Sequence, residues 1–207
     1  MSLRRRRPAG APRTGTPADL LVVGLGNPGE GYAGTRHNAG AAAVEALAGR
    51  YGGHLRRRAR IPALTDEVRV EGRRVALALP QTYMNASGEA VRKLTVRFGI
   101  EDLQRLVVIH DELDLPTGRV HIRVGGGLAG HNGLRSIRDH LRATSFARIR
   151  IGIGRPPSAA AGADYVLSRP GSRDREVLAA AAATAADAAE AIATDGVERA
   201  MNTFNAR

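Results

Sequence analysis

The 207-residue chain contains no cysteine and no tryptophan, and only 3% of its residues are aromatic. The lack of cysteine excludes disulfide bonds, thiolate metal ligands and a cysteine nucleophile. No run of 18 or more apolar residues occurs, so we expect no membrane span. The basic start of the chain, residues 1–7, is not followed by the apolar stretch of a secretory signal. These absences favour a cytoplasmic protein.

Acidic residues are fewer than basic ones, and the net charge is +11. Lys93 is the only lysine, so arginine supplies almost all of the positive charge. Residues 1–18 are rich in Pro, Gly and Arg, and we interpret them as a disordered basic arm, either a solvated tail without a role or an aid to nucleic-acid binding. Residues 19–207 remain basic without the arm, which indicates an anionic partner such as nucleic acid.

The remainder of the chain alternates between strand and helix patterns. Its length and its 43% hydrophobic content suit one domain with a full core. The patterns predict a single α/β domain, residues 19–207, in which a twisted mixed sheet has helices on both faces, in three layers. Strands are predicted at 20–25, 67–70, 73–79, 105–109, 119–124 and 147–153, helices at 39–50, 86–98, 134–142 and 172–193, a shorter helix after 196, and a Pro/Gly/Ala-rich loop at 154–163. Ser172 is expected to cap the long helix.

Polar clusters follow several of these strands. Asn27 and His37 follow the first strand, residues 80–85 follow the strand that ends at Leu79, residues 110–114 follow the strand that ends at Ile109, and residues 125–133 lie between a strand and a helix. In open α/β sheets, sites form outside the carboxyl ends of the strands. We therefore expect these four clusters to share one crevice.

The glycines of residues 24–29 match the G-x-G-x-x-G pattern of dinucleotide-binding loops. In that motif a helix starts at the third glycine and holds the pyrophosphate. Here Pro28, Gly31 and Gly34 oppose a helix at that point, and the acidic ribose ligand at the end of a second strand is missing. The context therefore disfavours a dinucleotide-dependent oxidoreductase.

The polar residues favour hydrolysis by activated water. His37 is suited to act as a base near neutral pH, and Asp111 can fix its tautomer. No serine stands in a nucleophile elbow, and no ligand spacing typical of a metal site occurs, so we expect neither a covalent intermediate nor a metal. Taken singly, these residues also fit structural roles: Asn85 and Asn132 could each cap the helix that follows.

The longer motifs decide between these alternatives. Residues 24–40 (GLGNPGEGYAGTRHNAG) closely resemble the signature of bacterial peptidyl-tRNA hydrolase. The segments QTYMNASG at 81–88, HDELD at 110–114, GGGLAGHNGL at 125–134 and RIRIGIGRP at 148–156 resemble further motifs of that family. Their order and spacing agree over about residues 20–205.

The resemblance implies an enzyme that cleaves the ester between a peptide and the 3′ end of tRNA, and so recycles tRNA from abortive translation. It assigns the catalytic base to His37 and its carboxylate partner to Asp111. It also implies substrate-binding roles for a second set, Asn27, Tyr32, Tyr83, Asn85 and Asn132. The tRNA phosphate clamp is expected at Arg123 and Arg150.

The expected partner is peptidyl-tRNA, bound through its acceptor arm and 3′ end by a monomer that needs no cofactor, membrane or obligatory protein partner. A non-catalytic RNA-binding or adaptor protein on the same fold is the second hypothesis, because fold does not guarantee activity. The presence of His37, Asp111 and all three asparagines favours the enzyme. Leu128 and Ala129 stand where relatives carry His or Gly, which leaves the RNA contact of that loop open.

Overall fold

The computed structural model describes residues 16–206, so the predicted basic arm lies almost entirely outside the described residues. Seven strands form one sheet in the order β2-β3-β4-β1-β5-β7-β6. The neighbours β4, β1, β5 and β7 run parallel, whereas β2, β3 and β6 pair antiparallel. Their bounds are β1 Leu20–Gly24, β2 Arg56–Arg58, β3 Ile61–Val70, β4 Arg73–Pro80, β5 Leu106–Glu112, β6 Val120–Val124 and β7 Ala147–Gly152.

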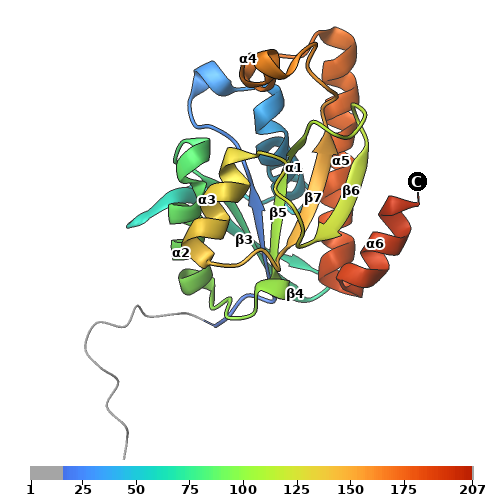
Figure 1. Ribbon diagram of the computed structural model, residues 1–207. Helices are drawn as coiled ribbons and strands as arrows, with labels where there is room; N and C mark the ends of the chain where they lie inside the picture. Colours follow the sequence, from blue (N-terminus) through green and yellow to red (C-terminus); the bar gives the residue numbers. More distant parts are fainter. Residues whose placement is uncertain (1–15, 207) are drawn as a thin grey trace, which may run out of the picture.

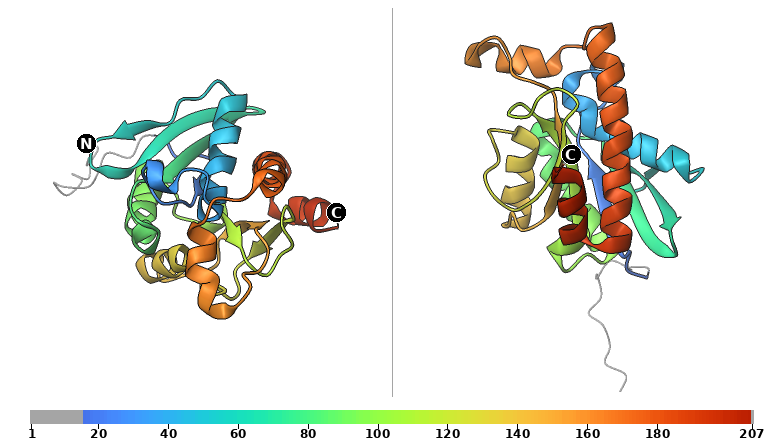
Figure 2. Two further views of the ribbon diagram at one scale, coloured as in Figure 1. Left: turned by 90° about the horizontal axis from the view of Figure 1, so that it is seen from above. Right: turned by 90° about the vertical axis from the view of Figure 1, so that its right-hand side faces the viewer.

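Helices cover both faces of this sheet, which confirms the predicted three-layer α/β fold (Figures 1 and 2). α2 (Ser87–Phe98) and α3 (Asn132–Leu141) pack on one face, and α1 (Ala39–Arg50) and α5 (Ser172–Asp195) pack on the other. α6 (Val197–Asn205) lies against β6, and α4 (Gly162–Leu167) lies above the sheet, at the end where β1 and β5 finish. Short 3₁₀ turns complete the chain: η1 Glu30–Tyr32, η2 Arg36–Asn38, η3 Met84–Ala86, η4 Leu103–Arg105 and η5 Ala159–Ala161.

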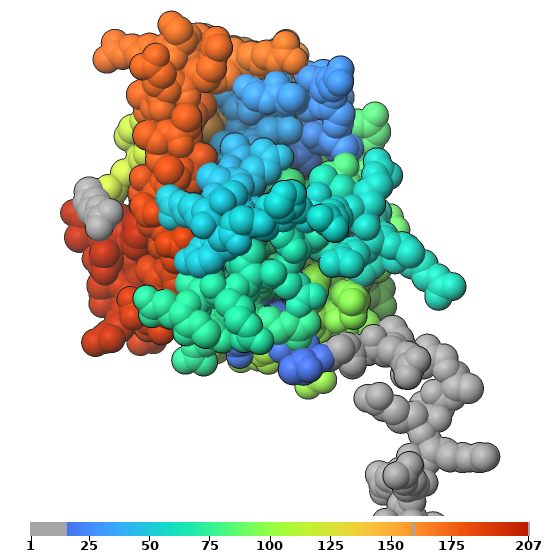
Figure 3. Space-filling model, turned by 180° about the vertical axis from the view of Figure 1, so that it is seen from behind, coloured from blue at the N-terminus to red at the C-terminus, as the bar shows by residue number. Residues whose placement is uncertain are grey.

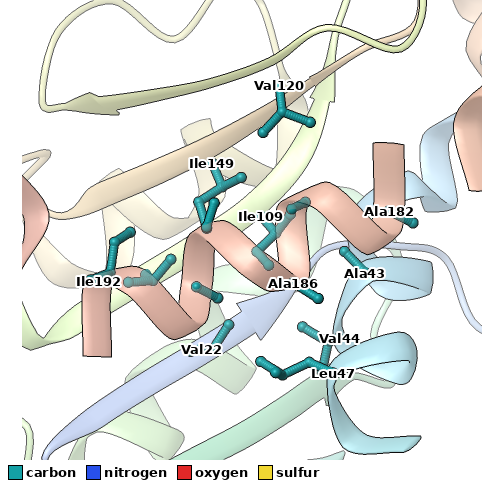
Figure 4. Close-up of a cluster of buried hydrophobic side chains, with 14 of the residues drawn as sticks. Val22, Ala43, Val44, Leu47, Ile109, Val120, Ile149, Ala182, Ala186 and Ile192 are labelled. Carbon is teal, nitrogen blue, oxygen red and sulfur yellow. The ribbon is translucent and has the colours of Figure 1, made fainter. Parts of the chain in front are cut away.

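α5 crosses the middle of the sheet and packs directly beside α1 (Figures 3 and 4). Alanines such as Ala182, Ala185 and Ala186 face the core, and their small side chains let the helix approach Val22 and Ile109 closely. α5 is the one described helix that is long and apolar enough to cross a membrane by length and composition. Its buried alanine face accounts for that apolar composition within the core of this fold.

The two edges of the sheet differ. At β6, the side-chain amide of Asn205 accepts a hydrogen bond from the Ile122 N–H at 2.8 Å and donates to the Ile122 carbonyl at 2.9 Å. The last residue of α6 thus takes the place of a further strand. At the other edge, the residues of β2 are three exposed arginines.

The predicted elements differ from the structure at five places, apart from shifts of one or two residues at their ends. The strand predicted at 67–70 begins six residues earlier, at Ile61. The strand predicted to stop at Ile109 continues to Glu112, so His110 and Asp111 belong to β5 and do not follow it. Ser172 does not cap α5; it is the first helical residue, after Gly171. The loop predicted at 154–163 contains η5 and the first residues of α4. β2 has no apolar residue, so its sequence carried no strand signal.

Candidate active site

The segment between β1 and α1 carries the first polar cluster. Its glycines serve close packing, because a Cβ on Gly24 would lie 2.4 Å from the Gly40 carbonyl oxygen and one on Gly40 would lie 2.1 Å from that of Ile109. This contact brings the start of α1 against β1 and β5. Only the three-residue 3₁₀ turn η1 follows Gly29, and α1 does not begin until Ala39, so no α-helix starts where a dinucleotide would need one. The geometry agrees with the rejection of that motif.

The three residues of η2 are each held by a different part of the fold. Arg36 donates from Nη1 to the Ser168 hydroxyl at 2.7 Å. His37 contacts Asp111 on β5, and the Asn38 side chain bonds both backbone groups of Asn27, at 2.9 and 3.0 Å. His37 is therefore fixed by its own contact and by both of its neighbours.

Asp111 is the centre of the polar cluster. Its two carboxylate oxygens lie 2.9 and 3.0 Å from Nδ1 of His37, and Oδ1 lies 3.0 Å from Nε2 of His131. Burial acts to raise the pKa of Asp111, but its contacts with His131 and His37 outweigh burial and hold that pKa well below its usual range. Asp111 is therefore a carboxylate that accepts from both rings, and Nε2 of a neutral His37 keeps its lone pair.

His131 was missed as a site residue by the sequence reasoning. Its Nδ1 lies 3.1 and 3.3 Å from the backbone N–H groups of Gly133 and Leu134, so it accepts from them and caps α3. Its proton is therefore on Nε2, toward Asp111. Neither Asn85 nor Asn132 caps its helix: α2 has no side-chain cap, and Asn132 is the first residue of α3.

His110 is buried, and its ring lies edge to face against that of His131, with centroids 5.0 Å apart. Its Nδ1 donates to the Asp111 backbone carbonyl at 2.7 Å. Burial lowers the pKa of His110 to about 3. His110 is thus a neutral structural residue.

The predicted single crevice is divided between two cavities. His37, Asp111 and Asn132 line a cavity of about 210 Å³, together with residues of β5, the loop before α3, and α4. Asn27 lines a neighbouring hollow of about 440 Å³, formed by the loop after β1, α1, β4 and the start of α5. Tyr32, Tyr83 and Asn85 line neither cavity.

Asn27 nevertheless connects these remaining residues to the site. Its Oδ1 accepts the backbone N–H of Met84 at 2.7 Å, which fixes η3 and with it Tyr83 and Asn85. Met84 is buried, whereas Tyr83 is 62% exposed. The Tyr83 ring meets that of Tyr32 edge to face, with ring centroids 6.2 Å apart. The half-buried Tyr32 and the exposed Tyr83 therefore form an aromatic pair beside His37.

A cationic surface lies at the β6 edge of the sheet. Arg123 pairs in register with Arg148, and His121 with Arg150, so all four side chains share one face. Arg148, which the sequence reasoning did not select, is buried and donates to the carbonyls of Gly125 and Gly127, and so shapes the glycine-rich loop. The alternation of arginines in β7 was the signal for it.

The two predicted phosphate ligands differ in their surroundings. Arg150 donates from Nε to buried Glu112 at 2.9 Å, so its charge is already partly compensated. Arg123 is exposed and is not ion-paired within the described residues. Of the two, Arg123 has the freer guanidinium.

The cluster of His37, Asp111 and His131 also has the spacing of a metal site, since one ligand atom from each lies within 4.8 Å of the others. Those atoms, however, are the ones that form the hydrogen bonds described above. His131 uses Nδ1 to accept two amide groups, which leaves a proton on the nitrogen that a metal would need. The donor set therefore fits a hydrogen-bonded pair of histidines on a carboxylate better than a metal centre.

Comparison with known proteins decides the family. The family model for peptidyl-tRNA hydrolase matches residues 21–207. The chain belongs to the peptidyl-tRNA hydrolase family. It is 50% identical to the peptidyl-tRNA hydrolase of Rubrobacter xylanophilus over 89% of this chain and 99% of that protein, and 46% identical to that of Chloroflexus aggregans over 89% and 98%. The crystal structure of the peptidyl-tRNA hydrolase from Acinetobacter baumannii matches with a TM-score of 0.86 and 39% identity, over 93% of this chain and 98% of that one.

Proposed function

We propose that this member of the peptidyl-tRNA hydrolase family hydrolyses the ester bond between a peptide and the 3′ end of tRNA, and so recycles tRNA from abortive translation. The observation that carries the proposal is the contact of His37 with ionised Asp111 at the wall of a cavity. Family membership and the fold support it.

In the proposed reaction, Nε2 of His37 takes a proton from a water molecule, and the resulting hydroxide attacks the ester carbonyl. Nδ1 of His37 donates to Asp111 throughout, and the carboxylate stabilises the imidazolium that forms. The tetrahedral intermediate expels the 3′ oxygen of the tRNA, which takes the proton from His37. The products are a peptide with a free carboxyl group and a tRNA with a free 3′ hydroxyl.

The remaining predicted residues are proposed to bind the substrate. Asn27, Asn85 and Asn132 carry amides, which offer both a donor and an acceptor to the backbone of a peptide of any sequence. Tyr83, with Tyr32 edge to face against it, offers an aromatic surface for its side chains. Arg123 and Arg150 are proposed to bind tRNA phosphate, with Arg123 the stronger contributor because Glu112 already occupies Arg150.

The setting of this activity is part of the same proposal. We infer that residues 19–207 form the hydrolase domain and that the protein is a monomer. It works in the cytoplasm, where peptidyl-tRNA arises, without a cofactor or an obligatory protein partner. The basic residues 1–18 are proposed as an arm that adds non-specific affinity for RNA.

A release assay with two substrates tests the proposal. Peptidyl-tRNA and aminoacyl-tRNA with the same tRNA are incubated with the wild-type protein, and free tRNA is measured over time. We expect fast release from peptidyl-tRNA and slow release from aminoacyl-tRNA, which lacks the amide that the asparagines would bind. Tight tRNA binding without release from either substrate would favour the non-catalytic adaptor instead.

A further inference from the structure

Arg36 is a buried arginine directly before His37, only 9% exposed. Its guanidinium group contacts three other side chains. Nη1 donates to the Ser168 hydroxyl at 2.7 Å, Nη2 lies 3.3 Å from the Asp174 carboxylate in the first turn of α5, and the plane lies 4.5 Å from the centre of the Tyr165 ring. Because burial of an arginine is costly unless its charge is paired, so many partners indicate a specific role.

Two partners of Arg36, Tyr165 and Ser168, lie in or directly after α4, the helix that closes the cavity beside His37. Gly162, Ala163 and Val166 of α4 line that cavity, together with His37 and Asp111. Yet α4 has no buried residue of its own. Apart from its contacts with Arg36, α4 is held by a side-chain hydrogen bond from the Tyr165 hydroxyl to the Ile153 carbonyl, at 2.6 Å. Tyr165 and Val166 also pack, partly buried, against the core. Among the polar and ring contacts that hold the cavity wall, Arg36 makes the most.

The same contacts reach the backbone of η2. The Arg36 N–H donates to the Ser168 carbonyl at 3.1 Å. The Arg169 side chain donates to the carbonyls of Glu30 and Ala33, in the part of the β1–α1 loop that precedes η2. In Figure 3 the orange end of α5 and the segment before it lie beside the blue loop. A shift of α4 would therefore be transmitted to the residue next to His37.

We propose that Arg36 is a positioning residue, which fastens α4 to the loop that carries His37 and so holds the cavity wall and the proposed base in one arrangement. This inference rests on the proposed function for its kinetic part. Arginine suits the position because one planar group stacks on Tyr165 while it donates in two directions. Lysine would keep the charge but lose the stacking and one of the two directed hydrogen bonds.

The experiment uses Arg36→Lys and Arg36→Gln, with Arg155→Gln as the matched control. Arg155 follows β7 in the sequence but is exposed, and its only described ion pair is a surface contact of 3.3 Å with Asp114. We expect kcat on peptidyl-tRNA to fall on the order of 10- to 100-fold in Arg36→Gln, as for a misplaced catalytic group, and less in Arg36→Lys. KM and the Kd for deacylated tRNA should stay within about twofold, since Arg36 lies apart from Arg123. Arg155→Gln should match the wild type.

A second measurement follows α4 itself and does not need activity. The chain has no tryptophan, so Leu167→Trp, at an exposed position of α4 outside the cavity lining, places a single fluorescent reporter there. We expect the time-resolved anisotropy of this introduced indole to show greater local motion when Arg36→Gln is added, and no change with Arg155→Gln. Tyr165→Leu removes the ring contact from the other side together with the hydroxyl bond to Ile153, whereas Tyr165→Phe removes only that bond. Tyr165→Leu should act in the same direction as Arg36→Gln and beyond Tyr165→Phe, which keeps the test valid if an Arg36 variant fails to fold.

The outcomes separate the two proposals. Loss of kcat together with greater motion of α4, at unchanged KM, supports the positioning role. Unchanged kcat in both Arg36→Gln and Tyr165→Leu overturns it, whatever the reporter shows, and so does a loss of kcat without any change in the motion of α4. If the wild type fails to release tRNA, the proposed function fails, and the fluorescence arm still decides whether Arg36 holds α4.

Discussion

The ring of His131 donates its Nε2 proton to Asp111 across 3.0 Å, while its Nδ1 accepts the first amide groups of α3. One side chain thus joins the start of a helix to the carboxylate that contacts His37. Because the amide groups can only donate, the tautomer of His131 is set by the helix. The ionised state of Asp111 therefore depends on the fold around it as well as on His37.

Replacement of His37 tests the proposed base. His37→Ala should lower kcat by about 10²- to 10⁴-fold, the usual contribution of general-base catalysis, while the Kd for tRNA changes little. The measurement is single-turnover release from peptidyl-tRNA, together with filter binding of deacylated tRNA. His54→Ala, at a histidine outside the described cavities, is the control. Near-normal turnover in His37→Ala would assign the base elsewhere.

Two variants of His131 separate its two contacts. His131→Ala removes both the cap of α3 and the donor to Asp111. We expect the loss of the cap to lower the free energy of unfolding by about 1 kcal/mol, and the loss of the donor to lower kcat. His131→Asn restores a capping side chain but is too short to donate to Asp111. We expect His131→Asn to regain most of the stability, measured by urea unfolding, while its kcat on peptidyl-tRNA stays low. Equal turnover in His131→Asn and the wild type would show that the donor to Asp111 is dispensable.

The buried His110 predicts a loss of stability in mild acid. Its pKa is lowered to about 3 in the folded protein, against about 6.5 in the unfolded chain, so between these values only the unfolded state takes the proton. Stability should therefore fall as the pH drops, by about 2 kcal/mol for this group between pH 7 and pH 5. The lowered pKa of Asp111 adds its own loss only at lower pH, as the pH falls through and below the usual aspartate range.

Urea unfolding at pH 7 and pH 5 measures this effect. His110→Gln, which keeps a polar side chain at the position but cannot titrate, should show a smaller difference between the two pH values than the wild type. An equal difference in both proteins would mean that other groups cause the acid sensitivity.

We expect the loss of Arg123 and the loss of Arg150, the two proposed phosphate ligands, to differ in their effects on tRNA binding and on stability. Arg123→Gln should weaken tRNA binding and lower the slope of log Kd against log salt by about 1, with unchanged stability. Arg150→Gln leaves the carboxylate of Glu112 buried without its partner, which costs about 3–5 kcal/mol. The double variant Glu112→Gln/Arg150→Gln removes both charges, and therefore tests the tRNA contact of Arg150 without this loss of stability. A salt slope unchanged by Arg123→Gln would remove that residue from the RNA interface.

The sequence predicted those parts of the fold in which apolar periodicity is strong. α1 begins and ends at the predicted residues, and the mixed sheet between two helix layers is confirmed. The errors arose where polar residues take up regular structure. His110 and Asp111 extend a buried strand because the Asp111 carboxylate and Nδ1 of His110 find partners inside the protein, which no local pattern reveals. β2 consists of arginines because it is an exposed edge.

The same reason limited the prediction of the site. The contact of His37 with Asp111 was predicted and is present. His131 was passed over because its role depends on two distant partners at once, the carboxylate on β5 and the amide groups of α3. Arg36 was noticed in the motif, but its partners come from residues 165–174, far along the chain. Such contacts depend on the tertiary fold, and only the three-dimensional arrangement reveals them.

The hydrogen bonds of Asn205 with β6 have a consequence for the order of events during synthesis. Ile122 is made long before Asn205, so its backbone groups wait for their partner while more than a third of the chain is still to be translated. During that time β6 presents an open edge that can pair with another nascent chain. Docking of α6 pairs these two backbone groups, so the last turn of α6 ends their exposure at the edge of β6.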